Sequence, residues 1–319
     1  MKLLALGRLL RLSLAPTAIA DVLAGLLLGA GGHWPAGRLP WLLIGATLGV
    51  YHGAMALNDW ADRAEDAQTR PDRPIPSGVI PAPVALAIGL GLVTAGIVAA
   101  SIAHQAMGLW MGIVGLLAIF YDLAGRGALR GPLLLALCRA GNLAAGTMAP
   151  VFMGIVEWHP LRLAPALLYG AYVFFVSRLG RLEDGEDRAE LGSRPARYLM
   201  SAGICLALVG LLPTVAIEGA LVHWPSLMPV ADSWGRIAAI VISGLAAAGL
   251  LRRAATLTEW TPQTIGASMG MALRRLLPFT ASCALLYPVS DGFDPIVVAI
   301  CILLGFPLSH ALRKVFPPS

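Results

Sequence analysis

The feature that most constrains this chain is a series of apolar runs, each long enough to cross a lipid bilayer as a helix. A hydrocarbon core about 30 Å thick is crossed by about 20 apolar residues in helical form. Such runs fall near residues 12–31, 40–57, 80–101, 105–123, 131–154, 163–177, 198–217, 233–251, 265–289 and 293–312. The pattern predicts an all-α fold, a polytopic transmembrane helix bundle of nine or ten spans.

The ninth run leaves the count open. Arg274 and Arg275 interrupt it, and if this run lies on the membrane surface the chain has nine spans. The composition agrees with a membrane protein, because 57% of the residues are hydrophobic and only 13% are charged. This composition excludes a soluble protein and a nucleic-acid partner. No linker or low-complexity tract divides the sequence, so we expect a single transmembrane domain over residues 1–319.

The basic residues predict the orientation. If the N-terminus is cytoplasmic, ten crossings place every Lys and Arg on the cytoplasmic side except Arg38, Arg139, Arg162 and Arg236. Cytoplasmic loops of membrane proteins carry such an excess of positive charge. We therefore expect an integral, multi-pass protein of a bacterial-type inner membrane, with the N-terminus and the acidic loops described next on the cytoplasmic side.

One acidic cluster follows the second apolar run, in the segment NDWADRAEDAQTRPDRPIPSG from Asn58 to Gly78. A spacing of four places Asn58, Asp62 and Asp66 along one face of a helix, whereas Asp59 and Glu65 point elsewhere and are weaker candidates. Mg²⁺ prefers oxygen ligands, commonly one or two carboxylates together with substrate phosphates. The stripe is therefore suited to a metal-bound diphosphate. The alternative interpretation is a solvated, charged loop.

A second acidic cluster follows the sixth apolar run, from Glu183 to Glu190. Two polar residues, Arg139 and Asn142, lie within the fifth run at a spacing that places them on one helix face. A charged side chain in the membrane is costly unless it faces a cavity or a partner. We expect both to line a central cavity, with Arg139 reaching a diphosphate or acidic groups. The alternative is a buried structural ion pair, which we favour for Asp21.

The segment from Asn58 to Gly78 resembles the first signature of the UbiA superfamily of intramembrane prenyltransferases, NDxxDxxxD followed by an RPIPSG-type turn. The resemblance implies the UbiA-like prenyltransferase fold. It also implies that Asn58, Asp62 and Asp66 bind Mg²⁺ and that Arg70 and Arg73 lie near the diphosphate of a polyprenyl donor. Here Asp62 and Asp66 would be catalytic.

The family also has a tyrosine followed four and five residues later by a Lys-Arg pair that holds the diphosphate. Tyr121 and Arg126 match this pattern, but Gly125 replaces the lysine. The resemblance therefore implies that Tyr121 and Arg126 bind substrate, as would Arg139 and Asn142 if they line the cavity. Arg126 on its own would be an ordinary cytoplasmic charge.

The second acidic cluster is similar to the family's second aspartate signature. The resemblance implies that Glu183, Asp184 and Asp187 bind a second Mg²⁺ and that Asp184 and Asp187 are catalytic. The copy is imperfect, because a glutamate stands four residues before Asp187. This departure indicates a divergent branch, and the segment resembles UbiA-like proteins of the bacterial Ebo gene cluster.

The resemblance implies an Mg²⁺-dependent transferase. It would move a polyprenyl group from a prenyl diphosphate to an aromatic or other lipid-soluble acceptor, with membrane lipids around it. Two alternatives remain: a non-catalytic UbiA-like protein that binds or transports an isoprenoid lipid, and a transporter of another class, for which we find no internal repeat. The DG-x2-AR pattern of CDP-alcohol phosphotransferases is absent.

Overall fold

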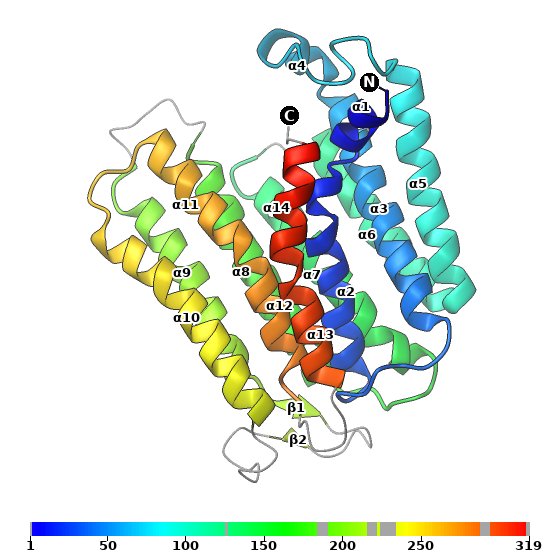
Figure 1. Ribbon diagram of the computed structural model, residues 1–319, viewed down its shortest axis with the longest axis vertical. Coiled ribbons are helices and arrows are strands. Elements are labelled where there is room, and N and C mark those ends of the chain that lie inside the picture. The colour runs from blue at the N-terminus through cyan, green and yellow to red at the C-terminus, as the bar shows by residue number, and fades with distance from the viewer. Residues whose placement is uncertain are drawn as a thin grey trace.

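The computed structural model describes residues 2–124, 127–183, 191–215, 222–223, 234–287 and 294–316. Helices run along the long axis of the molecule and form one bundle (Figure 1). They are α1 (Lys2–Leu9), η1 (Leu12–Leu14), α2 (Ala15–Gly29), α3 (Leu39–Ala61), α4 (Arg63–Thr69), α5 (Ala82–Ala103), α6 (Gln105–Ala124), α7 (Arg130–Phe152), η2 (Pro160–Leu163), α8 (Ala164–Gly180), α9 (Arg194–Leu208), η4 (Val209–Leu211), α10 (Trp234–Thr256), α11 (Pro262–Arg274), α12 (Leu276–Ala284), α13 (Asp294–Leu303) and α14 (Gly305–Val315).

The helical fold class predicted from the sequence is confirmed. Eight helical segments of the described chain are long and apolar enough to cross a membrane. These are Leu12–Gly29, Leu39–Ala61, Ala82–Ala103, Gln105–Leu123, Arg130–Phe152, Pro160–Gly180, Trp234–Thr256 and Asp294–Val315. The predicted count of nine or ten spans is roughly consistent with this, because two further predicted runs also form helices beside the others, although each is interrupted.

The first interrupted run is 198–217. Helix α9 ends at Leu208, η4 adds one short turn, and the chain then becomes extended. Thr214–Val215 forms strand β1, which pairs antiparallel with β2 (Val222–His223). The apolar run therefore extends beyond the helix, because apolar residues suit a short strand as well as a helix.

The second interrupted run is 265–289, where α11 ends at Arg274 and α12 begins at Leu276. The Arg275 guanidinium donates to the carbonyl oxygens of Ala246 and Met271, at 2.8 Å in both cases. Every residue of α12 is buried. The short apolar stretch after the arginines is thus surrounded by protein, which explains its hydropathy.

Helices α2 and α7 make the close contact that positions the buried polar residues. A β-carbon on Gly25 would overlap the carbonyl oxygen of Leu143, and one on Gly146 would lie 2.6 Å from the carbonyl oxygen of Val22. Small residues allow this approach in membranes, where packing rather than water exclusion drives helix association. The contact brings Asp21 of α2 against Arg139 of α7.

Both ends of the chain lie at one end of the bundle, together with α1 and α4, whereas β1 and β2 lie at the other (Figure 1). A β-carbon on Gly7 of α1 would overlap the ring of Phe316, so the chain after α14 packs on α1. The first acidic cluster, at the junction of α3 and α4, lies at this end of the bundle.

Candidate functional site

Six polar residues from three parts of the chain form a partly buried network at the end of α3. We call it the Asp59 network: Arg11, Asn58, Asp59, Asp66, Arg73 and Asp122. Arg11 Nη2 donates to Asp59 Oδ1 at 2.9 Å and to Asn58 Oδ1 at 3.2 Å. Asn58 Nδ2 donates to Asp122 Oδ1 at 3.0 Å. One amide therefore joins an arginine before α2 to a carboxyl group at the end of α6.

Arg73 enters the network from the turn after α4. The backbone N–H of Arg73 donates to the Arg70 carbonyl at 3.1 Å, and that of Ser77 donates to the Arg73 carbonyl at 3.0 Å, so the proline-rich segment folds back on itself. This turn buries Arg73, whose Nη1 lies 2.5 Å from Asp66 Oδ2 and 3.5 Å from Asp59 Oδ1. Arg73 thus bridges two carboxylates.

Arg11 reaches the network because its backbone adopts the left-handed conformation. It sits between α1 and η1 in the left-handed region, with φ 50° and ψ 48°, and among the described residues it is the only non-glycine with positive φ. This conformation costs on the order of 1 kcal/mol for a residue with a β-carbon. In this conformation the Arg11 guanidinium reaches the buried Asp59 carboxylate, 2.9 Å away.

The structure preserves the predicted stripe of Asn58, Asp62 and Asp66. The backbone N–H of Asp62 donates to the Asn58 carbonyl, and that of Asp66 donates to the Asp62 carbonyl, both at 2.9 Å. The i, i+4 register therefore continues across the junction of α3 and α4. Asp66 is buried, Asn58 and Asp62 are partly buried, and the predicted diphosphate contact Arg70 is exposed at the end of α4.

Asp59 was a weaker candidate than the stripe in the sequence, but the structure buries it at the centre of this network. Asp59 is only 2% exposed and pairs with both Arg11 and Arg73. The helical stripe could not show this, because both arginines come from other elements. Asp122, 8% exposed, was missed as well. Its one sequence signal was a carboxyl group next to Tyr121, near the end of an apolar run.

The two acids have unused acceptor capacity. Asp59 Oδ2 and Asp122 Oδ2 are buried, and neither accepts a hydrogen bond from any residue that the structure describes. Buried polar atoms are normally satisfied, so each exception requires an explanation. A ligand that supplies a cation or a donor at this position would satisfy them.

The second acidic cluster is only partly described. Asp184 and Asp187 lie outside the described residues, as does Arg126. Glu183 is described: a β-carbon on Gly266 would lie 2.5 Å from Glu183 Oε1, so its carboxylate lies against α11. Helix α11 lies to the left of α14 in Figure 1 and extends toward the end of the bundle where α4 lies.

A second polar network lies midway along α2, and we call it the Asp21 network: Asp21, Thr47, Arg139, Asn142 and Tyr169. Asp21 Oδ1 accepts from Tyr169 at 2.7 Å and from Arg139 at 3.3 Å, and Asp21 Oδ2 accepts from Asn142 at 3.1 Å. Asn142 Oδ1 in turn accepts from Thr47. The structure thus brings the predicted residues Arg139 and Asn142 together, on a buried carboxylate.

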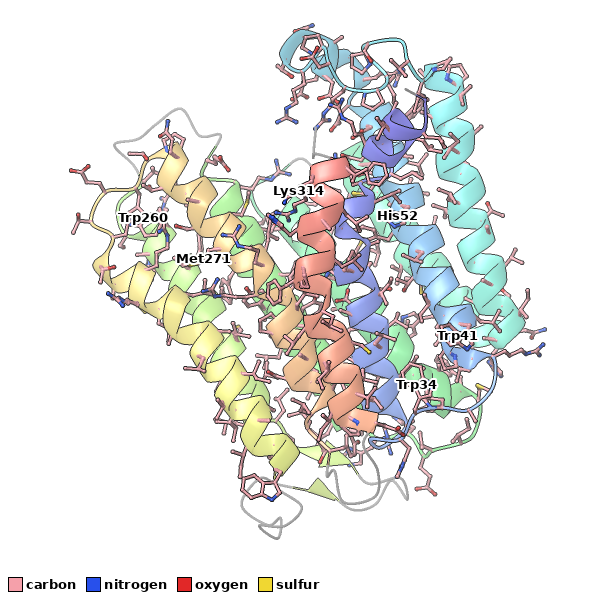
Figure 2. The ribbon with its side chains drawn as sticks, viewed as in Figure 1. Trp34, Trp41, His52, Trp260, Met271 and Lys314 are labelled. Carbon is pink, nitrogen blue, oxygen red and sulfur yellow. The ribbon has the colours of Figure 1, made fainter. Side chains whose placement is uncertain are left out.

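Two labelled side chains show the surroundings of these networks (Figure 2). His52 of α3 lies beside the N-terminal segment, and its Nδ1 is 2.6 Å from the carbonyl oxygen of Leu10. Because a carbonyl can only accept, Nδ1 carries a proton, so His52 ties α3 to the turn that holds Arg11. Lys314 of α14 lies on the side of that helix that faces α11 (Figure 2).

The side chains of the candidate site carry the kind of ligand atoms that Mg²⁺ prefers. Asn58, Asp62 and Asp66 offer oxygen ligands, which suit this ion, and the Asp59 network contains two acid oxygens that are unsatisfied within the described chain. Within the described ranges no three His, Cys, Asp or Glu residues are gathered to hold a metal ion. Asp66 and Asp59 instead pair with arginines. The oxygen ligands of the site therefore suit Mg²⁺. In this structure, arginine side chains balance the negative charge of the carboxylates.

Comparison with known proteins places the chain in a family. The 33 kDa chain of bacteriochlorophyll synthase from Cereibacter sphaeroides is 45% identical over 62 residues, 18% of this chain and 20% of that protein. Digeranylgeranylglyceryl phosphate synthase from Methanothrix thermoacetophila is 40% identical over 86 residues, 27% and 32% of the two chains. The matches thus span about a fifth and a third of these relatives.

The fold comparison covers nearly the whole chain. The apo structure of a UbiA homolog from Aeropyrum pernix K1 is similar with a TM-score of 0.58 at 15% identity, over 92% of this chain and 98% of that one. This likeness shows a shared fold. The UbiA prenyltransferase family itself matches residues 18–277, which include the Asp21 network, every member of the Asp59 network except Arg11, and the described part of the second acidic cluster. The chain is an integral membrane protein that belongs to the UbiA prenyltransferase family.

Proposed function

We propose that this protein is an Mg²⁺-dependent intramembrane prenyltransferase. It moves a polyprenyl group from a prenyl diphosphate to an aromatic or other lipid-soluble acceptor. The observation that carries the proposal is the Asp59 network: three carboxyl groups and one amide are gathered at the end of a membrane helix, and two buried acid oxygens are unsatisfied within the described chain. The family membership supplies the reaction class.

The residues divide into two roles. Asn58, Asp62 and Asp66 on one side, and Glu183, Asp184 and Asp187 on the other, would hold Mg²⁺. When bound, this ion would neutralise the negative charge of the diphosphate leaving group. Arg70, Arg73, Tyr121 and Arg126 would bind the diphosphate oxygens directly. Arginine suits this role because its planar fork of donors matches phosphate geometry.

Arg73 and Arg11 would also stabilise the closely packed carboxylates of the site before substrate binds. Carboxylates packed closely at a membrane surface repel one another, and the two guanidinium groups reduce that repulsion. Arg73 already lies within hydrogen-bond distance of Asp66, so a diphosphate bound to that carboxylate through a cation would also be within reach of Arg73. We propose the same orientation as the sequence predicts, with this end of the bundle cytoplasmic in a bacterial-type inner membrane.

A non-catalytic isoprenoid-binding protein is the second candidate. It is favoured by Glu183, which replaces an aspartate of the second signature and lies against α11 at Gly266. A longer side chain moves a coordinating oxygen, and misplacement of about 1 Å can cost on the order of a hundredfold in rate. Substrate contacts from Arg139 and Asn142 remain a prediction, because both now bind Asp21.

The test is calorimetric titration of purified protein with a non-hydrolysable prenyl thiodiphosphate, with Mg²⁺ and with EDTA. We expect Asp62→Ala and Asp66→Ala to abolish the Mg²⁺-dependent binding. Asp72→Ala is the matched control, because Asp72 is an exposed acid of the same segment. Binding retained in the first two variants would contradict the proposal. Release of diphosphate from a cleavable donor with Mg²⁺ then separates an enzyme from a binder.

A further inference from the structure

Asp122 has no role in the motifs described above, yet it contacts their first residue. It lies near the end of α6, is 8% exposed, and accepts a hydrogen bond from Asn58 Nδ2 at 3.0 Å. On the other side of the same amide, Arg11 Nη2 donates to Asn58 Oδ1 at 3.2 Å. The carboxamide of Asn58 is thus held between a residue that can only donate and a carboxyl oxygen that accepts.

This arrangement fixes which end of the amide faces which neighbour. The oxygen and nitrogen of an asparagine side chain have nearly the same shape, so only hydrogen-bond partners distinguish the two orientations. If the Asn58 amide rotated by half a turn, its NH₂ group would face the Arg11 guanidinium and its oxygen would face Asp122 Oδ1. Both hydrogen bonds would then be lost, because two donors would face each other at Arg11 and two acceptors would face each other at Asp122.

The orientation matters because only the oxygen of an amide binds a hard metal ion. We infer that Asp122 is a positioning residue: it holds the Asn58 amide through Nδ2, so that Oδ1 is directed away from α6 and toward the side of Arg11. The inference rests on the proposed function, in which Asn58 is a metal ligand. Asp122 itself acts through Asn58. Residues that orient a ligand commonly change metal affinity by about 10–100-fold when they are replaced.

The first experiment tests the contact without any ligand. Melting temperatures in EDTA are compared for wild type, Asn58→Asp, Asp122→Asn and the double variant. Asn58→Asp places two acceptors opposite each other and lowers the melting temperature. In the double variant the amide and the carboxyl group exchange places, so the hydrogen bond forms again and the melting temperature recovers. A double variant no more stable than Asn58→Asp would overturn the inference.

The second experiment tests the consequence for metal binding. The half-saturating Mg²⁺ concentration for binding of the prenyl thiodiphosphate rises about tenfold in Asp122→Leu, which has no acceptor. It stays within about threefold of wild type in Asp122→Asn, whose carbonyl can still accept from Asn58. Asp72→Asn, an exposed substitution, controls for the lost charge.

The two readouts separate the inference from the function on which it rests. An unchanged half-saturating concentration in Asp122→Leu, with binding intact in wild type, would contradict a positioning role. An equal increase in Asp122→Asn and Asp122→Leu would also contradict it, since it would indicate an effect of charge alone. Wild type that binds the analogue equally in Mg²⁺ and EDTA would contradict the proposed function, and the melting experiment would still decide whether Asp122 holds Asn58.

Discussion

The two polar networks of this bundle differ in how fully their hydrogen bonds are satisfied. In the Asp21 network both carboxylate oxygens accept bonds, three in all, from Arg139, Tyr169 and Asn142. In the Asp59 network the central carboxylate uses only one oxygen, and Asp122 likewise leaves Oδ2 without a partner in the described chain. The first network is complete on its own, whereas the second leaves two acceptor atoms unsatisfied within the described chain.

We infer from this difference that similar polar residues have different roles in the two networks. A buried charge that is paired and hydrogen-bonded needs nothing further, and removing one partner exposes the full cost of burying the other. A network with unsatisfied acceptors at the end of a bundle can instead exchange its internal partners for a ligand. We therefore propose that the Asp21 network stabilises the fold and that the Asp59 network binds the ligand, and each of the following variants tests that division.

The largest effect is expected from Asp21→Ala. It leaves the Arg139 guanidinium buried between α2, α7 and α8 without its carboxylate. Breaking a buried ion pair in this way typically costs about 3–5 kcal/mol of folding free energy. The loss is measured by unfolding in detergent. Unchanged stability, combined with weaker binding of the prenyl thiodiphosphate, would move this network to the substrate site.

Tyr169→Phe should have the next largest effect. It removes a donor to Asp21 Oδ1 and an acceptor for Arg139, at 2.7 and 2.8 Å, but keeps the ring packed on Phe279. Hydrogen bonds to charged groups contribute about 1.5–3 kcal/mol. The unfolding measurement should show a loss of that size, and titration with the prenyl thiodiphosphate should match wild type. A weakened titration at full stability would be the contrary result.

The last effect, that of Arg73→Ala, is measured in ligand binding on folded protein, because the variant also leaves buried Asp66 without its guanidinium and so costs folding stability. It removes the guanidinium that bridges Asp59 and Asp66 and that we propose contacts the diphosphate. At saturating Mg²⁺ the affinity for the prenyl thiodiphosphate should fall about tenfold, which corresponds to about 1.4 kcal/mol. Arg63→Ala is the control, because Arg63 is exposed and stacks on Trp60, 4.5 Å from the ring centre. Equal losses in both variants would indicate a general charge effect.

The sequence was sufficient to predict the bundle, because burying backbone groups in lipid permits few alternatives to helices. It was less informative where protein rather than lipid surrounds an apolar segment. Helix α12 is apolar because it is buried by its neighbours, and the apolar run that begins in α9 continues past η4 into a short strand. Hydropathy indicates that a segment is buried, but it does not indicate whether lipid or protein buries it.

Within the candidate site, the sequence predicted only the arrangement of residues that lie along one helix. The spacing of Asn58, Asp62 and Asp66 follows from helical geometry alone, and the backbone keeps that register. The roles of Asp59 and Asp122 depend on Arg11, Arg73 and the packing of α6 beside α3, which are tertiary contacts between distant parts of the chain. Without those contacts, Asp59 was interpreted as pointing elsewhere.

The most direct test of the account is one titration of purified wild type, Asp66→Ala and Asp72→Ala with the prenyl thiodiphosphate, each in Mg²⁺ and in EDTA. We expect saturable binding in wild type and in Asp72→Ala that disappears in EDTA, and no such binding in Asp66→Ala. Equal binding in all three proteins, or binding that persists in EDTA, would contradict it.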